Sequence, residues 1–215
     1  MSNPESFIDE VTEEVRRDKL YAQLRKYGWI GVLAVLLLVG GAAANEWIKA
    51  RDRAAAEATG DAILAAVEID DAAARLATLD GLGAEGDRTA LITLIAAAVA
   101  DDPAEADRRL AALAEDTSRP ALYRDLAQLK RTLLPGALDA AARVEVLTPL
   151  TAPGGAFRVL AEEQIALAEI ELGQTEAART RLKALLSDTE ASQALRRRVS
   201  QLIVALGGTA PGSAP

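Results

Sequence analysis

The chain has 215 residues, contains neither cysteine nor histidine, and is only 3% aromatic. Without thiols and imidazoles it can form no disulfide, no Ser-His-Asp triad and no zinc site built from those side chains. Its 24 basic and 32 acidic side chains give a net charge of −8, which argues against nucleic acid as a partner.

Residues 1–26 are predicted to form a charged, largely helical segment on the cytoplasmic side of a membrane. Ser6 can cap a helix that runs to Lys26, and apolar residues recur along it at near-helical spacing. Acidic side chains come early in this helix and basic ones late, an order that complements the helix dipole. The segment is either a docking helix or a solvated extension of the membrane helix.

Residues 27–47 are predicted to form a transmembrane helix. The stretch from Tyr27 to Ala44 has 18 residues without a charge, and a bilayer core requires roughly 17–25. Trp29 and Trp47 bracket this stretch and are separated by about 27 Å along a helix, which suits the two interfacial belts of a bilayer. Tyr27, Trp29 and Trp47 are therefore the predicted anchor residues.

Two other interpretations of this apolar stretch remain open. One is the core helix of a soluble domain, although such helices are usually shorter and amphipathic. The other is a signal peptide cleaved after Ala44, because Ala42 to Ala44 fits the small-residue pattern of a cleavage site. The preceding 26 residues include six acidic side chains, unlike a short basic leader, and this favours an uncleaved anchor.

The basic residues that flank the anchor predict its orientation. Five precede the apolar stretch and three follow it, namely Arg16, Arg17, Lys19, Arg25 and Lys26 before it and Lys49, Arg51 and Arg53 after it. Basic residues favour the cytoplasmic side of a membrane, so the N-terminus is predicted to be cytoplasmic and the C-terminal domain to lie outside.

A repeated pattern predicts that residues 48–207 form an all-α domain of eight or nine helices. An alanine is followed by leucines four and seven positions later in three sets, which are Ala72, Leu76 and Leu79; Ala106, Leu110 and Leu113; and Ala178, Leu182 and Leu185. Leu147 and Leu150 belong to a fourth set in which Arg143 replaces the alanine, and the sets are offset by 34, 37 and 35 residues. This spacing forms one apolar stripe per helix, and the period is that of a helix–turn–helix repeat.

Partner helices and helix ends are also predicted. Two further apolar stripes are Leu122, Leu126, Leu129 and Leu133, and Ala161, Ile165, Ala168 and Leu172. Asp102 with Pro103, Ser118 before Arg119-Pro120, and Thr175 are predicted to start helices, and Gly173 to stop one. A capping box of Ser187 and Glu190 predicts a last helix over about Glu190–Leu206. The residues from 208 to 215 are predicted to form a flexible tail.

Charged clusters give no sign of catalysis. The acid pairs Asp70-Asp71, Asp101-Asp102 and Glu162-Glu163 are adjacent in sequence, so on a helix they diverge, and we expect them to cap helices. The basic run from Arg196 to Arg198 is interpreted as a solvated helix face. We expect no catalytic residues, no cofactor, no metal and no small-molecule ligand.

The stretch LGQTEAARTRLKALL (Leu172–Leu186) resembles the linker and second helix of a tetratricopeptide repeat. The layout of the whole chain resembles the YfgM family of bacterial inner-membrane proteins. The residues that carry this resemblance are SFIDEVTEEVRRDKL (Ser6–Leu20), the span with its tryptophans, and PLTAPGGAFRVLAEEQIALAEIELG (Pro149–Gly173). One departure is Glu169, which occupies the usual aromatic position of the repeat.

This resemblance implies a transmembrane helix followed by a periplasmic tetratricopeptide-like solenoid, in an accessory subunit of the Sec translocon. The implied partners are translocon subunits, periplasmic chaperones and nascent secreted chains. A scaffold for wall synthesis or division, and an envelope enzyme or ligand binder, are the alternatives. Tyr123, Phe157 and Arg158 are the candidate contact residues, because aromatic and arginine side chains dominate binding hot spots. Core packing is the other interpretation of the two aromatic residues.

Overall fold

The computed structural model describes residues 4–83 and 86–208, with side chains described from Arg25 onward. The predicted tail therefore lies outside the described residues, except for Gly208. The side chains of most of the N-terminal segment lie outside them as well. The chain divides into two units, one ending at Ala58 and one beginning at Thr59.

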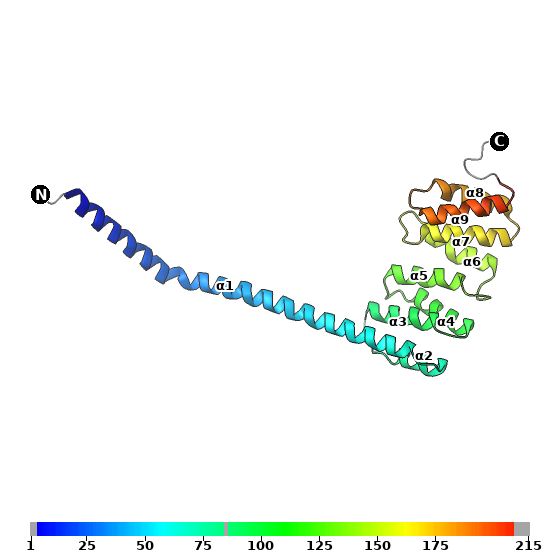
Figure 1. The fold of residues 1–215 in the computed structure, drawn as a ribbon, viewed down its shortest axis with the longest axis horizontal. Helices are drawn as coiled ribbons and strands as arrows, with labels where there is room; N and C mark the ends of the chain where they lie inside the picture. Colours follow the sequence, from blue (N-terminus) through cyan, green and yellow to red (C-terminus); the bar gives the residue numbers. More distant parts are fainter. Residues whose placement is uncertain (1–3, 84–85, 209–215) are drawn as a thin grey trace. The chain divides into compact units, whose positions relative to one another are not determined.

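The described residues form helices and no strands, which confirms the all-α prediction (Figure 1). The helices are α1 (Pro4–Val67), α2 (Ala72–Asp80), α3 (Asp87–Ala98), α4 (Pro103–Glu115), α5 (Ala121–Thr132), α6 (Ala140–Leu147), the short 3-10 helix η1 (Thr148–Thr151), α7 (Arg158–Glu171), α8 (Thr175–Ser187) and α9 (Gln193–Ala205).

Helix α1 is continuous for 64 residues, so the predicted N-terminal helix and membrane helix are one element. No proline follows Pro4 in this stretch, and helix-forming alanines dominate its second half. The helix also passes through Gly60. Its last turns belong to the second unit, where Ile63 and Ala66 are buried against Leu79 of α2 and Ile92 of α3.

The second unit has a series of small cores instead of one large core. Each core joins three or four successive elements: α1 with α2 and α3, then α3 with α4 and α5, then α5 with α6, η1 and α7, and finally α7 with α8 and α9. A series of small cores, each joining elements close together in the sequence, is typical of helical-repeat architecture.

The repeated Ala/Leu sets lie in these cores. The sets on α4 and α8 are fully buried, and on α2 only Leu79 is, while Ala72 and Leu76 are half-buried. Leu147 and Leu150 are buried too, but not on one helix, because α6 ends at Leu147 and Leu150 lies in η1. Arg143 reaches from α6 to Glu171 at the end of α7 and forms an ion pair there.

Several predicted helix ends are correct. The Asp102 carboxylate accepts a hydrogen bond from the Ala104 amide at 2.9 Å, and Pro103 opens α4. Gly173 ends α7 with a φ of +74°, a left-handed conformation that glycine adopts without strain. This turn lets the Gln174 amide donate to the Glu169 carbonyl at 2.8 Å.

Other predicted starts are wrong. Ser118 does not cap α5, because its hydroxyl and amide both bond to the Asp116 carboxylate. Thr175 is the first residue of α8 and not its cap. The last helix begins at Gln193 with Ser192 as its cap. Ser187 is the last residue of α8, so the predicted capping box of Ser187 and Glu190 does not form.

The two partner stripes are only partly buried. Leu129, Ala161, Ile165 and Ala168 pack in cores. In contrast, three leucines at helix ends are exposed. Leu122 lies in the first turn of α5, and Leu133 and Leu172 lie just past the last turns of α5 and α7. Helical periodicity identified the correct face, but the ends of short helices extend past their neighbours.

Replacing Ala178 by leucine tests the helix packing. Ala178 of α8 is fully buried, whereas its neighbour Ala177 is exposed. The added isobutyl group has no space at Ala178, so Ala178→Leu should lower the free energy of unfolding by about 1–3 kcal/mol. The measurement is denaturant unfolding of the full chain in detergent, followed by circular dichroism. Ala177→Leu is the matched control, and equal stability of the two variants would refute this packing.

Candidate membrane anchor and protein-binding surfaces

In the first unit, helix α1 presents its apolar residues outward. Among the described residues, α1 is the one helix long and apolar enough to cross a membrane, and none of its most apolar window is buried. Tyr27, Trp29 and Trp47 are all exposed, and so are the leucines and valines between them. A core helix of a soluble domain would bury this surface, so its full exposure favours contact with lipid.

In the second unit, helix α7 carries two buried carboxylates. Glu163 is 5% exposed and Glu169 is 6% exposed. Both oxygens of Glu163 accept hydrogen bonds from Arg198 of α9, each at 2.8 Å. Burial of a carboxylate is costly unless a cation and hydrogen bonds compensate it, and a planar guanidinium supplies both.

Arg181 of α8 compensates the second buried carboxylate. Its guanidinium donates to Glu169 at 2.8 Å and also pairs with Glu162. The hydrogen bonds that Arg181 donates to the Glu169 carboxylate are the main cause that raises the pKa of Arg181. Helix α7 is thus held to α8 by Arg181 and to α9 by Arg198. The prediction that Glu162 and Glu163 cap a helix is therefore wrong.

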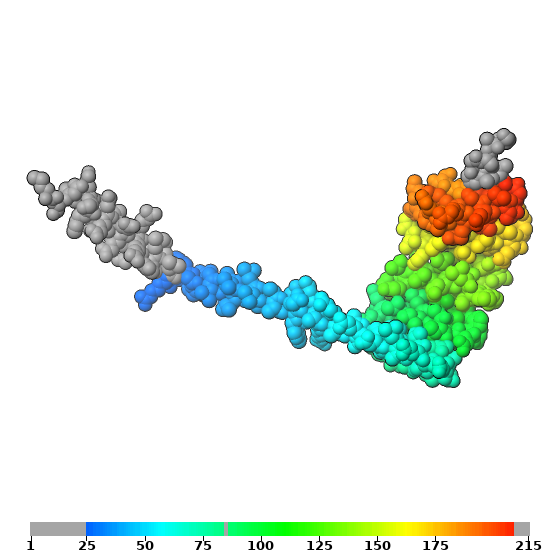
Figure 2. Space-filling model, in the orientation of Figure 1, coloured from blue at the N-terminus to red at the C-terminus, as the bar shows by residue number. Residues whose placement is uncertain are grey.

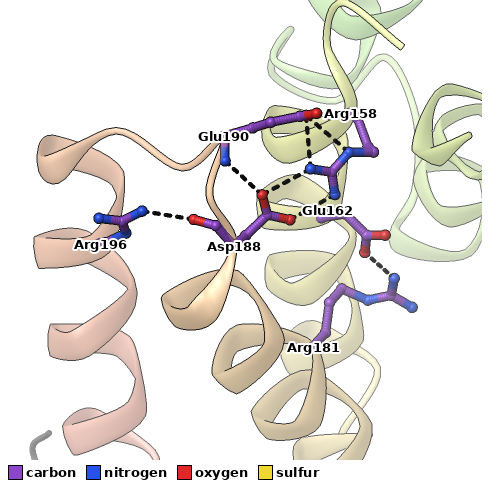
Figure 3. A network of polar contacts seen from close by, with 6 residues as sticks. All are labelled: Arg158, Glu162, Arg181, Asp188, Glu190 and Arg196. Atoms are coloured by element: carbon purple, nitrogen blue, oxygen red, sulfur yellow. Dashed lines mark hydrogen bonds and ion pairs between the residues drawn. The ribbon is translucent and has the colours of Figure 1, made fainter. Parts of the chain in front are cut away.

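A third group of charges closes the α8–α9 loop onto the start of α7 (Figure 3). Arg158 donates to the Asp188 carboxylate at 2.8 Å and to the Glu190 carboxylate at 2.7 Å. The Glu190 amide donates to Asp188 at 2.8 Å, and Arg196 donates to the Asp188 backbone carbonyl at 2.7 Å. Hydrogen bonds from Arg158 and from the Glu190 amide hold the pKa of Asp188 below its usual range.

These contacts revise the interpretation of the basic run. Arg196 and Arg198 bind groups on other elements. Arg197 and Arg198 are nevertheless exposed, as expected for a solvated face, and Arg196 is not. Sequence analysis missed the partners of these arginines because they are distant along the chain. The sequence offers one hint of such a pair at Glu169, an acidic residue at a position where a tetratricopeptide repeat usually has an aromatic one.

The three candidate contact residues are already engaged within the domain. Tyr123 is half-buried against the core of α3, α4 and α5. Phe157 packs on the core that contains Leu147 and Ile165. Arg158 is held by Asp188 and Glu190. The aromatic pair therefore fits the core-packing interpretation, and the structure does not bring the three side chains together in one exposed site.

An open apolar groove lies between α7 and α9, with a volume of about 600 Å³. Its walls are Leu160, Gln164 and Leu167 on α7 and Gln201, Leu202 and Ala205 on α9, and the Glu163–Arg198 pair lies within it. Leu160 is 38% exposed. An apolar surface with a few amide groups at its edge can take an extended or helical peptide segment.

Acidic residues of the pairs outside α7 cap helices or form an ion pair. Asp71 accepts a hydrogen bond from the Ala74 amide at the start of α2, as Asp102 does for α4. Asp101 pairs with Arg75 at 3.3 Å. Among the side chains described, those of residues 25–83 and 86–208, no group of three or more acidic side chains is placed to hold a metal ion.

Comparison with protein-family models, with curated proteins and with solved structures finds no match to this chain.

The hydrogen bonds of Asp188 predict that part of the free energy of unfolding depends on pH in the acidic range. Folding lowers the pKa of Asp188, so its ionised carboxylate stabilises the folded state above about pH 4. This stabilisation is lost as pH falls through the lowered pKa. Asp188→Asn should therefore lower the urea midpoint at pH 7 and reduce the difference between midpoints at pH 7 and pH 3. Asp61→Asn, at an exposed residue of α1 without a hydrogen bond or ion pair in the described structure, is the control. Identical behaviour of the two variants would contradict the assignment.

Proposed function

We propose that this protein is a single-pass membrane protein whose helical domain binds other proteins. The observation that carries the proposal is the α7–α9 groove, an apolar surface with Leu160 at its wall that no part of the described chain fills. The exposed apolar face of α1 supports a membrane anchor in the same chain. An anchor confines the domain near the membrane and raises its effective concentration for segments that emerge there.

The finer proposal places the protein at the Sec translocon of a bacterial inner membrane. Its domain would lie in the periplasm and link translocating chains to periplasmic chaperones. The resemblance of the chain's layout to the YfgM family supports this location. A translocating chain exposes apolar segments before it folds, and a shallow apolar groove can hold such segments and suppress aggregation.

Cysteine labelling tests the orientation. The chain has no cysteine of its own, so Ser6→Cys and Gln193→Cys each provide one reactive thiol. With a membrane-impermeant maleimide on spheroplasts, Gln193→Cys should be labelled at once and Ser6→Cys only after lysis. The reverse pattern would invert the topology. If the mass of the labelled protein matches a chain that begins after Ala44, the apolar stretch is cleaved and the anchor is refuted.

Photo-crosslinking in cells tests the partners. A photoreactive residue at Leu160 lies in the α7–α9 groove, one at Val35 lies in the apolar part of α1, and one at exposed Ala194 serves as the control. We expect translocon subunits from Val35, and nascent secreted chains or chaperones from Leu160 but not from Ala194. Wall-synthesis or division proteins without translocon subunits would refute the translocon proposal and favour the scaffold. Identical adducts from Leu160 and Ala194 would refute the groove.

A further inference from the structure

Two basic side chains lie where the apolar part of helix α1 begins. Arg25 and Lys26 are both exposed, and they directly precede Tyr27, the first residue of the uncharged stretch. The amine of Lys26 lies 5.4 Å from the centroid of the Tyr27 ring, which is a cation–π contact. No hydrogen bond or ion pair joins Arg25 or Lys26 to any side chain that the structure describes. We call Arg25, Lys26 and Trp29 the N-terminal boundary site.

Carboxylates are distant from the N-terminal boundary site along the helix. The nearest one before Arg25 in the sequence is that of Asp18, about 10 Å away along a helix. The nearest one after Lys26 is that of Glu46, about 30 Å away. Because α1 is one continuous helix, it does not fold back to bring these positions closer. The two positive charges are therefore not offset by a neighbouring carboxylate of α1.

The opposite end of the apolar stretch has a different charge balance. Residues 45–57 contain three basic and three acidic side chains, which are Lys49, Arg51 and Arg53 and Glu46, Asp52 and Glu57. Glu46 precedes Lys49 by three residues and Arg53 precedes Glu57 by four, and residues at these spacings share a face of a helix. The cations at this end are therefore offset by acids of the same helix.

Helix geometry places the two N-terminal cations and an apolar surface on one side of α1. Trp29 follows Arg25 by four residues and Lys26 by three, so the three side chains share a face. Leu33 continues this face one turn further, and Trp29 and Leu33 are both exposed. Helical side chains lean toward the N-terminus, so the two cations lean away from the apolar stretch. This surface complements a molecule with an anionic head and an apolar tail.

We propose that the N-terminal boundary site binds an anionic phospholipid in preference to a zwitterionic one. The phosphate of the lipid accepts hydrogen bonds from Arg25 and Lys26, and an acyl chain lies along Trp29 and Leu33. Basic side chains near a bilayer gain attraction from an anionic headgroup that a zwitterionic headgroup does not supply. This binding rests on the proposed membrane anchor, because only an inserted helix presents Trp29 to acyl chains.

The two tryptophans provide a reporter at each end of the apolar stretch. The chain has only two, so Trp47→Phe leaves Trp29 as the single reporter and Trp29→Phe leaves Trp47. Each full-length variant is reconstituted into vesicles of equal parts phosphatidylglycerol and phosphatidylcholine, and one or the other lipid has brominated acyl chains. Bromine quenches tryptophan fluorescence at contact, so the ratio of quenching by the two lipids reports which one lies beside the ring. Both leaflets have the same composition, so the ratio does not depend on the orientation of the chain.

At near-physiological salt we expect phosphatidylglycerol to be favoured beside Trp29 by at least about threefold and beside Trp47 by less than about 1.5-fold. Equal quenching of Trp29 by the two brominated lipids would overturn the proposal. Extraction of the vesicles with alkaline carbonate is measured in parallel. Release of the chain would refute the anchor and the lipid site with it, whereas a retained chain with equal quenching would refute the lipid site alone.

A charge-matched pair of variants separates the N-terminal boundary site from net charge. In the chain with Trp29 as its single tryptophan, Arg25→Gln with Lys26→Gln should abolish the preference for phosphatidylglycerol. Lys49→Gln with Arg51→Gln removes the same charge at the other end and should leave the preference at about threefold. Equal loss in both double variants would show attraction to net charge only and would overturn the proposal.

Removing acids from the other end of the apolar stretch tests the same charge balance in reverse. In the chain with Trp47 as its single tryptophan, Glu46→Gln with Asp52→Asn leaves the three bases there in excess. This variant should gain a preference of about threefold for phosphatidylglycerol beside Trp47. If no preference arises, uncompensated bases next to this helix do not select anionic lipid, and the proposal is wrong.

Discussion

The packing of the three C-terminal helices α7, α8 and α9 depends on two buried carboxylates of α7, which arginines from the other two helices neutralise. Glu169 faces Arg181 on α8, and Glu163 faces Arg198 on α9. A buried carboxylate without its partner is strongly destabilising, whereas van der Waals contacts between aliphatic side chains tolerate small shifts. These pairs therefore specify how the three helices are arranged.

This arrangement gives α7 two different faces in contact with solvent. On one side, Leu160 and Leu167 form an apolar wall with α9. On the other side, the shared carboxylates around Arg158 and Arg181 surround the small residues of α8 (Figures 2 and 3 show this end of the second unit and its charges). The two faces therefore differ in chemistry: one is lined by apolar side chains, and the other has ion pairs beside small side chains.

Sequence patterns predicted the features that depend on local spacing. The Ala/Leu stripes, the cap at Asp102 and the stop at Gly173 follow from helix geometry and from neighbouring residues. The ion pairs could not be predicted in this way, because Arg198 lies 35 residues from Glu163 and Arg181 lies 12 from Glu169. The last helix start was misplaced for a different reason: Ser187, which local rules assigned to a cap, is the last residue of α8, and Ser192 caps α9 instead.

A double-mutant cycle on Arg181 and Glu169 tests this account most directly. Denaturant unfolding of the full chain would be compared for Arg181→Leu, Glu169→Leu and the double variant. Because Arg181→Leu leaves Glu169 buried and unpaired, we expect it to cost about 3 kcal/mol or more, and the double variant to be more stable than Arg181→Leu alone. A double variant whose loss equals the sum of the two single losses would show that the pair does not hold α7 to α8.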